Sequence, residues 1–438
     1  MAPVERMPVE IALNVTGPLA ASQRLDDFGY VEEEFFVDGA VDAFDPDGIR
    51  IAADVKFATR VLVRRPNDAG AASGTAFVDP LHMIDEMPAS WSASEWLMDN
   101  GHTWVGVTVH NSSFGRSYDY VGGVGALQQA DPERYGSLRL EEFDRPPRLV
   151  SYAGPSATDS FALKWKMAMA HPQGHPIIAG VAQLLKSGAA ISSRPFRHVY
   201  GCGVSQTANF WRLFLDHGWH ELARAGDGSV AFDAYVLIVS PAPAHRPADA
   251  VLVNVLSESE VVGTIVQVPA TAPADSHVPA VRGIEFPGSG HSMGHLLAGG
   301  PAPDHEHTDE PYSMFLPAVF ANLDAWVRGG PPMPHVPRIQ RDPTSVDGVA
   351  RDEHGNALGG VRAPWLEAPR AQYLPRCPCS PTNGQTVPFS PEKLAALYAT
   401  DDEYRARWNR AVDRLVEDRL LLVADAEAMR ARASVSRG

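Results

Sequence analysis

A strand, a tight turn and a helix follow one another between residues 197 and 218, and this succession constrains the fold more than any other stretch. The apolar run from Arg197 to Cys202 is typical of a buried strand. The run from Ala208 to His217 has apolar residues at helical spacing and stops at Gly218. Ser205 stands at the tip of the turn. A serine there projects from the end of a strand beside a helix N-terminus, so residues 202–207, here called the elbow, carry a candidate nucleophile.

Predicted strands alternate with predicted helices through the first 330 residues. This alternation indicates right-handed βαβ units, and therefore a mostly parallel sheet with helices on both faces. The expected strands are residues 9–15, 29–37, 59–65, 74–79, 103–109, 233–240, 250–256 and 281–286, besides the elbow strand. The expected helices are residues 92–99, 159–170, 176–186 and 312–327, besides the elbow helix.

Two stretches depart from this alternation. Residues 110–157 are rich in turn-forming residues and indicate a loop insertion, and residues 331–390 are rich in proline and irregular. Beyond them lies a helical pattern whose apolar face comprises Tyr404, Trp408, Ala411, Val412 and Leu415, and then a second short helix near 424–432. We expect residues 1–330 to form the core with an N-terminal β extension, and residues 331–438 to pack on it as part of the same structural unit. Both irregular stretches are candidate lids.

A second serine competes with Ser205. The pattern Gly-x-Ser-x-Gly occurs intact at Gly290-His291-Ser292-Met293-Gly294. A nucleophile turn needs a strand before the serine and a helix after it. The stretch before Ser292 contains Pro287 and two glycines, and the stretch after it runs into Gly299-Gly300-Pro301, so neither element is expected there. Context therefore favours Ser205.

A serine hydroxyl becomes a good nucleophile only when a histidine takes its proton and a carboxylate orients that histidine. In enzymes with such an elbow, the chain order is serine, acid, histidine. The strand at 250–256 is followed by Ser257-Glu258-Ser259-Glu260, so Glu258 and Glu260 are both candidate acids. The strand at 281–286 is followed by a glycine-rich loop that ends at His291, the candidate base, with His295 as the second choice.

The oxyanion of an acyl-transfer reaction needs two backbone N–H donors. One comes from the residue after the nucleophile, here Gln206, and the other from the loop after an earlier core strand. The strand at 74–79 and the following Pro80-Leu81-His82-Met83 fit that role, so the second donor is expected at Leu81 or His82. The His82 side chain either faces the substrate or lies on the surface.

The chain resembles a family of bacterial α/β-hydrolase domain proteins with predicted esterase activity. The resemblance spans nearly the whole length and is carried by GYVEEE (29–34), TRVLVRRP (59–66), GTAFV (74–78), WVGV (104–107), DPERYGSL (131–138), SQT (205–207), SESE (257–260), EFPGSGH (285–291) and GNALGGVR (355–362).

The resemblance implies an α/β-hydrolase fold, with Ser205 as nucleophile and His291 as base. At the acid, the family usually reads Glu-x-Asp with its Asp at position 260, which favours Glu260 over Glu258. The chain departs from the family at Thr207, which is bulkier than the usual residue. It departs again in the oxyanion loop, where Pro80 and His82 stand in place of Trp and Asn.

Composition excludes several other classes. A formal net charge of −16 disfavours nucleic acid as a partner, and no apolar run is long enough for a membrane span. The first ten residues do not indicate a signal peptide, and three cysteines do not make a disulfide framework, so a cytoplasmic location is expected. The cluster from Asp304 to Glu310 contains possible metal ligands, but a solvated loop is the simpler interpretation.

The sequence thus predicts a serine hydrolase that cleaves small-molecule carboxylic esters through an acyl-enzyme, with no metal or organic cofactor. Two alternatives stay open. One is an amidase, thioesterase or acyltransferase with the same three residues, and the other is a non-catalytic ligand-binding protein that retains the fold.

Overall fold

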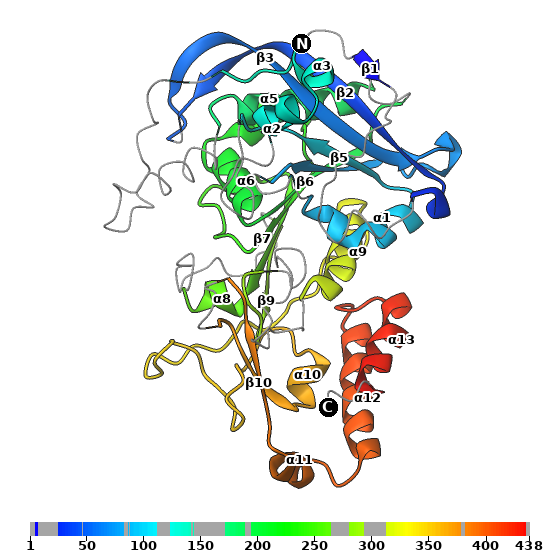
Figure 1. Cartoon of the computed structure of the whole chain (residues 1–438), viewed down its shortest axis with the longest axis vertical. Coiled ribbons are helices and arrows are strands. Elements are labelled where there is room, and N and C mark those ends of the chain that lie inside the picture. The colour runs from blue at the N-terminus through cyan, green and yellow to red at the C-terminus, as the bar shows by residue number, and fades with distance from the viewer. Residues whose placement is uncertain are drawn as a thin grey trace. The chain divides into compact units, whose positions relative to one another are not determined.

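The structure is a computed structural model of the 438-residue chain, and it describes residues 5–7, 25–45, 47–82, 86, 88–111, 123–141, 143, 171–188, 194–263, 280–292, 312–377 and 382–434. The chain divides into two compact units (Figure 1). The first comprises residues 1–238 and 243–252, and the second comprises residues 239–242 and 253–438. Residue 330, where the sequence predicts the core segment to end, lies inside the second unit. The predicted strand 9–15, the predicted helix 159–170, Met83, His295 and the cluster at 304–310 lie outside the described residues.

The strands of the first unit begin with an antiparallel group. In this group β2 pairs with β1, β3 pairs with β2, and β5 pairs with β3. The bounds are β1 (Glu5–Met7), β2 (Tyr30–Phe44), β3 (Arg50–Pro66) and β5 (Thr103–Val107). These strands lie where the sequence predicts an N-terminal β extension. The β2–β3 hairpin is longer than predicted because cross-strand pairing carries it past Gly39, where the sequence pattern breaks off.

The central strands are parallel. They are β4 (Thr75–Pro80), β6 (His198–Val204) and β7 (Ala234–Ile238), and β4 also pairs in parallel with β5. Among the described residues, the strands of the sheet follow the order β1-β2-β3-β5-β4-β6-β7-β8-β9. The chain runs from β4 to β5 on one side and then returns to β6 on the other side of β4. The crevice at the carboxyl ends of strands where the order reverses in this way is the usual place for a ligand site.

The helices of the first unit include two that the sequence analysis assigned to loops. Residues 110–157 contain α2 and α3, so the predicted loop insertion is partly helical, with Asp131 capping α3 through the Arg134 N–H. The predicted helix at 176–186 is confirmed as α5, which ends at Gly188 in a left-handed conformation. The bounds are α1 (Ser94–Asp99), α2 (Gly123–Ala130), α3 (Pro132–Tyr135), α5 (Gly174–Ser187), α6 (Gln206–Asp216) and α7 (Trp219–Leu222).

The second unit contains most of β8 and all elements that follow it. Residues 331–390, predicted to be irregular, include a short helix and an antiparallel hairpin of β10 and β11. The bounds are β8 (Val251–Ser257), α8 (Glu258–Val261), β9 (Val281–Phe286), α9 (Leu316–Val327), α10 (Pro364–Glu367), β10 (Ala371–Leu374), β11 (Gln385–Pro388), α11 (Pro391–Leu397), α12 (Asp401–Glu417) and α13 (Val423–Ala431).

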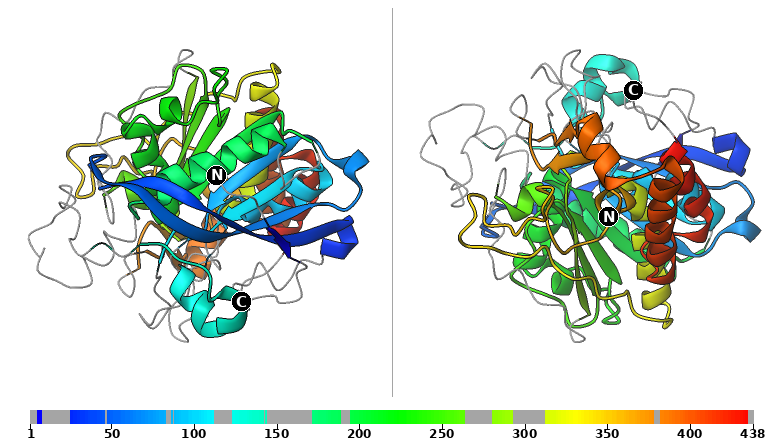
Figure 2. Two further views of the ribbon diagram at one scale, coloured as in Figure 1. Left: turned by 90° about the horizontal axis from the view of Figure 1, so that it is seen from above. Right: turned by 90° about the horizontal axis from the view of Figure 1, so that it is seen from below.

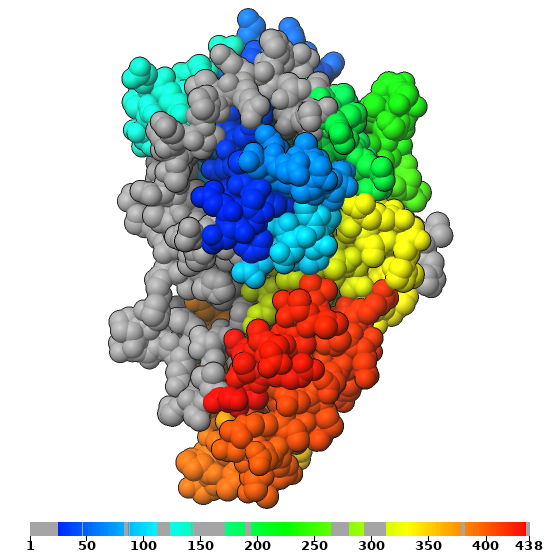
Figure 3. All heavy atoms as spheres, turned by 90° about the vertical axis from the view of Figure 1, so that its right-hand side faces the viewer, coloured from blue at the N-terminus to red at the C-terminus, as the bar shows by residue number. Residues whose placement is uncertain are grey.

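The C-terminal helices confirm the predicted amphipathic pattern. The buried residues of α12 are the five expected on its apolar face. Helices α12 and α13 lie side by side (Figure 2). The Trp408 indole N–H donates to the Met429 carbonyl over 2.9 Å. Figure 3 shows the outer surface of these two helices. Within the described part of the chain, no helix is long and apolar enough to cross a membrane.

Candidate functional site

Ser205 lies in the turn between β6 and α6 and has a backbone φ of 52° and ψ of −110°. A residue with a side chain rarely adopts such a conformation, and strain of this kind clusters in functional turns. Two backbone hydrogen bonds hold the turn: the Ser205 N–H donates to the Ile238 carbonyl over 2.8 Å, and the Asn209 N–H donates to the Ser205 carbonyl over 2.9 Å. The predicted succession of strand, sharp turn and helix is therefore confirmed.

Gly203 and Thr207 allow the turn to be this tight. A Cβ atom on Gly203 would lie 2.5 Å from the carbonyl carbon and oxygen of Thr207. Thr207 occupies the position where such turns usually have glycine. Its buried hydroxyl accepts the Val204 N–H over 2.9 Å and donates to the Val204 carbonyl over 3.0 Å. The bulkier residue is thus accommodated because its hydroxyl forms hydrogen bonds with the backbone N–H and carbonyl of Val204 at the end of β6.

Glu260 and His291 form a buried hydrogen-bonded pair in the second unit. The Nδ1 atom of His291 donates to Oε1 of Glu260 over 2.6 Å, and the two side chains are 5% and 0% exposed. A hydrogen held on Nδ1 leaves Nε2 of the neutral ring to accept a proton. The arrangement is therefore that of a general base with its orienting carboxylate.

The second oxygen of Glu260 caps the helix on which the residue lies. Oε2 accepts the Ser257 N–H over 3.0 Å and the Ser257 hydroxyl over 2.7 Å, which completes a capping box at the start of α8. A capping box requires the reach of Glu or Gln at the third helical position. The Glu260 side chain thus folds back over the start of α8 with one carboxylate oxygen and contacts His291 with the other.

Glu258, the other candidate acid, has different partners. Its fully buried carboxylate accepts the Gly288 N–H over 2.6 Å and a guanidinium N–H of Arg351 over 2.6 Å. Burial raises the pKa of Glu258, and the adjacent Arg351 opposes that rise. Of the two carboxylates that the sequence leaves open, Glu260 is therefore the one that contacts the histidine.

Ser292 lies outside any elbow. Strand β9 ends at Phe286, five residues before His291, and the intervening residues form a turn and loop. The Ser292 hydroxyl donates to Oδ1 of Asn383 over 2.8 Å, and its N–H donates to the Thr382 carbonyl over 2.8 Å. Its hydroxyl thus joins two loops.

Leu81 and His82 follow β4, which pairs in parallel with β6, so they and the elbow lie at the same edge of the sheet. The Leu81 N–H donates to the Val107 carbonyl over 2.9 Å. The Leu81 carbonyl accepts from Nε2 of His110 over 3.1 Å. Burial lowers the pKa of His110 to about 4, so its ring is neutral at ordinary pH. Because a trans peptide directs its C=O and N–H in opposite directions, His110 fixes where the His82 N–H points.

The predicted site residues are divided between the two units. Ser205, Gln206, Leu81 and His82 belong to the first unit, and Glu258, Glu260 and His291 belong to the second. Gln206 is the first residue of α6, so its N–H lies at the N-terminal end of the helix. Among the residues that the structure describes, no three His, Cys, Asp or Glu side chains are grouped closely enough to hold a metal ion.

Residues 6–431 match the model of a protein family described as the alpha/beta hydrolase domain. The chain belongs to this family. The family assignment confirms both the resemblance found in the sequence and the predicted α/β-hydrolase fold. No protein with a curated description matches the chain.

Solved structures of esterases resemble this alpha/beta hydrolase weakly. Brefeldin A esterase, described as a bacterial homologue of human hormone-sensitive lipase, is 12% identical at a TM-score of 0.22; the match covers 47% of this chain and 40% of the esterase. A cold-adapted esterase from an Arctic intertidal metagenomic library is 8% identical at a TM-score of 0.25, and the match covers 52% of this chain and 72% of the esterase. The rice cell-wall-degrading esterase of Xanthomonas oryzae is 12% identical at a TM-score of 0.22, and the match covers 48% of this chain and 42% of the esterase.

Three residues near the candidate site of this alpha/beta hydrolase have no role in the sequence analysis: Arg351, His110 and Asp79. The first two act through contacts between distant parts of the chain, which leave no local pattern. Asp79 had a visible signal, because a carboxylate follows the apolar run of β4, one residue before the strand ends at Pro80. Its Oδ2 accepts from the Trp104 indole over 2.7 Å and from the Ser90 hydroxyl over 2.7 Å, and burial raises its pKa to about 6.

Proposed function

We propose that this alpha/beta hydrolase is a serine esterase that cleaves small-molecule carboxylic esters, with Ser205 as nucleophile, His291 as base and Glu260 as the orienting acid. The observation that carries the proposal is the buried hydrogen bond between Glu260 and His291. A carboxylate that fixes the hydrogen on Nδ1 leaves Nε2 ready to accept a proton. A nucleophilic serine requires such a base to remove its hydroxyl proton.

In the proposed reaction, Nε2 of His291 removes the hydroxyl proton of Ser205 while its oxygen attacks the acyl carbon. The tetrahedral intermediate collapses when His291 gives the proton to the departing alcohol, which leaves an acyl-enzyme. Water, activated by the same nitrogen, then releases the acid and restores Ser205. Glu260 stabilises the imidazolium that forms in both steps.

The oxyanion is held by two backbone N–H groups in this scheme. Gln206 supplies one from the start of α6, where the helix dipole adds to the attraction. Of the two alternatives for the second donor, His82 is better supported than Leu81. The Leu81 N–H already donates to the Val107 carbonyl. The Leu81 carbonyl is bound by His110, which orients the His82 N–H.

The test is hydrolysis of a panel of p-nitrophenyl esters with acyl chains of two to twelve carbons. We expect turnover of at least one ester, a loss of at least about 10³-fold in kcat for Ser205→Ala, and near wild-type turnover for the matched control Ser292→Ala. Lack of turnover on every ester, together with hydrolysis of an amide or thioester, would favour the alternative acyl-transfer chemistries. Lack of reaction with all of them would favour a binding protein.

The acid is tested separately by charge-neutral variants. Glu260→Gln keeps the size of the side chain but presents an amide that selects the wrong tautomer of His291. We expect a loss of about 10³-fold to 10⁴-fold in kcat, as for the orienting acid of other serine hydrolases. Glu258→Gln should cost much less, because its amide oxygen can still accept the Gly288 N–H. A larger loss in Glu258→Gln than in Glu260→Gln would contradict the assignment.

A further inference from the structure

Residues 339–358, here called the support loop, pack against α8, the single helical turn that carries Glu260. Three stretches of the loop run side by side and are joined by backbone hydrogen bonds of 2.9 Å among Gln340, Ala350 and Leu358. A buried apolar cluster lies between the support loop and α8, and it comprises Leu256, Val261, Ile339, Val349 and Ala357. One turn of helix is not stable by itself, so its position depends on this packing.

Two arginines of the support loop bind the two ends of α8. A guanidinium N–H of Arg341 donates to the Val261 carbonyl at the C-terminal end. Arg351 donates to the Glu258 carboxylate in the first turn. A cation at the carbonyl end of a helix and a carboxylate at its N–H end are both favourable placements. The support loop therefore fixes both ends of the helix that presents the proposed catalytic acid.

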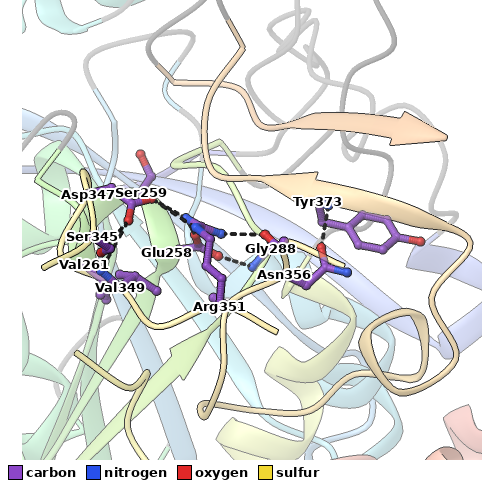
Figure 4. A network of polar contacts seen from close by, with 12 residues as sticks. Glu258, Ser259, Val261, Gly288, Ser345, Asp347, Val349, Arg351, Asn356 and Tyr373 are labelled. Atoms are coloured by element: carbon purple, nitrogen blue, oxygen red, sulfur yellow. Dashed lines mark hydrogen bonds and ion pairs between the residues drawn. The ribbon is translucent and has the colours of Figure 1, made fainter. Parts of the chain in front are cut away.

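Glu258 extends this connection to the turn that precedes the histidine. One carboxylate oxygen accepts from Arg351, and the other accepts the Gly288 N–H over 2.6 Å (Figure 4). A second bond joins the same two elements, because the Ser259 N–H donates to the Ser289 carbonyl over 3.3 Å. Helix α8 and the turn that precedes His291 are thus held in a fixed position relative to each other. Glu258 is the side chain that joins both of them to the support loop.

The guanidinium of Arg351 is itself held by several acceptors. Its Nε donates to Oδ2 of Asp347 over 3.2 Å (Figure 4). Its Nη1 donates to the Gly355 carbonyl over 3.1 Å. The Arg351 side chain is 20% exposed, whereas Glu258 is 0% exposed. Loss of one partner of a buried pair leaves an uncompensated charge, which either takes up a proton or moves toward water. Either response would alter the acceptor of the Gly288 N–H.

We propose that Arg351 is a positioning residue that acts through Glu258 to keep Glu260 aligned with His291. The inference rests on the proposed function, because it assumes that the aligned pair serves catalysis. The support loop lies in residues 331–390, one of the two candidate lids. Within this segment, the support loop packs against α8, the helix that carries Glu260, and the apolar contacts between them are buried.

The kinetic test compares Arg351→Met with the double variant Glu258→Gln/Arg351→Met. The single variant leaves Glu258 buried and unpaired, so we expect kcat to fall about 10-fold to 100-fold with KM within about threefold, as for a small misplacement of a catalytic group. The double variant removes both charges, and we expect its kcat to return to within about fivefold of wild type. If the single variant unfolds, the double variant still decides the question, because the only carboxylate that it leaves without Arg351 is that of Asp347, which is 31% exposed.

The matched control is Arg414→Met. Arg414, a residue of α12, also donates to a carboxylate over 2.6 Å, but its partner Glu367 is the last residue of α10 and not a residue of α8. We expect wild-type kcat in this variant. A kcat in Arg351→Met equal to that of Arg414→Met would overturn the inference. So would a folded double variant with the kcat of the single variant, because the loss would then come from packing and not from the unpaired carboxylate.

A spectroscopic readout separates this inference from the proposed function. The Nδ1 hydrogen between His291 and Glu260 lies in a short charge-assisted hydrogen bond and should give a far-downfield proton resonance that is absent in His291→Gln. We expect the resonance to shift or vanish in Arg351→Met and to return in the double variant, whether or not the enzyme turns over esters. An unchanged resonance in Arg351→Met would overturn the role of Arg351, and full ester turnover by Ser205→Ala would overturn the proposed function alone.

Discussion

Replacement of Gly203 by alanine should force the elbow apart. The added Cβ would lie 2.5 Å from the carbonyl carbon and oxygen of Thr207 and 2.6 Å from the Ala208 nitrogen. Ordinary contact begins at 3.4 Å, so the strand end and the helix start must separate by about 0.9 Å (3.4 minus 2.5). The three clashing atoms all belong to the backbone, so no side chain can rotate away to relieve the contact.

This displacement has a cost in stability and a larger cost in activity. Overpacking of a close contact costs about 1–3 kcal/mol. The two hydrogen bonds between Thr207 and Val204, at 2.9 and 3.0 Å, would lengthen beyond bonding distance, and each contributes about 1 kcal/mol. We therefore expect Gly203→Ala to lower the free energy of unfolding by about 3–5 kcal/mol. Ser205 lies between the separated elements, and a shift of about 1 Å in a catalytic group costs about 10²-fold in rate.

The assay is urea unfolding and p-nitrophenyl ester hydrolysis of Gly203→Ala beside Gly226→Ala. Gly226 is exposed, and a Cβ atom there would meet nothing within 4 Å, so the control adds the same methyl group without a clash. We expect the control to match the wild type in both measurements. Equal urea midpoints and equal turnover in the two variants would refute the claim that the elbow is closed by direct backbone contact at Gly203.

Two further predictions concern the carboxyl end of β4. Burial raises the pKa of Asp79 from 3.8 to about 6, so the stability that its proton contributes is fully present below pH 3.8 and is lost as the pH rises through 6. The loss is about 3 kcal/mol, and we expect the stability of Asp79→Asn relative to wild type to rise by this amount from pH 3 to pH 7 in urea unfolding. A difference independent of pH would contradict the buried, proton-binding carboxyl. The second variant, His110→Leu, removes the donor to the Leu81 carbonyl and should lower kcat about 10-fold with KM nearly unchanged, while His110→Gln should retain more of the rate. Equal kcat in His110→Leu and wild type would show that this carbonyl does not orient the oxyanion donor.

Local pattern is sufficient to predict the elbow. Cys202 to Thr207 are consecutive, and the strand and helix on either side have their own periodicity, so the turn follows from neighbours in the chain. The apolar face of α12 is predictable for the same reason. The competing Ser292 is rejected from sequence because proline and glycine break the required elements, and the structure has a loop there.

The choice between Glu258 and Glu260 exceeds what local pattern can decide. Both carboxylates lie on one helical turn, both are fully buried, and both end in strong hydrogen bonds. Their roles differ only because tertiary packing brings His291 to one and Arg351 to the other. Arg351 follows Glu258 by 93 residues and lies in a stretch without periodicity, so no feature of the sequence connects the two.

The pattern of residues 331–390 is misleading for a related reason. Proline removes N–H donors and breaks periodicity, which the sequence analysis interprets as irregular structure. The support loop is nevertheless ordered, because its hydrogen bonds join Gln340 to Ala350 and Leu358, at separations of ten and eighteen residues. Bonds of this kind depend on the fold of the whole unit and have no signature in a short window.

The central claim is that Ser205 is the nucleophile, and the most direct measurement locates a covalent fluorophosphonate adduct by peptide mass spectrometry. We expect one adduct per chain, on the peptide that contains Ser205, with no labelling in Ser205→Ala and slow labelling in His291→Gln. Ser292→Ala should label like the wild type. An adduct on Ser292, or labelling that persists in Ser205→Ala, would contradict the account.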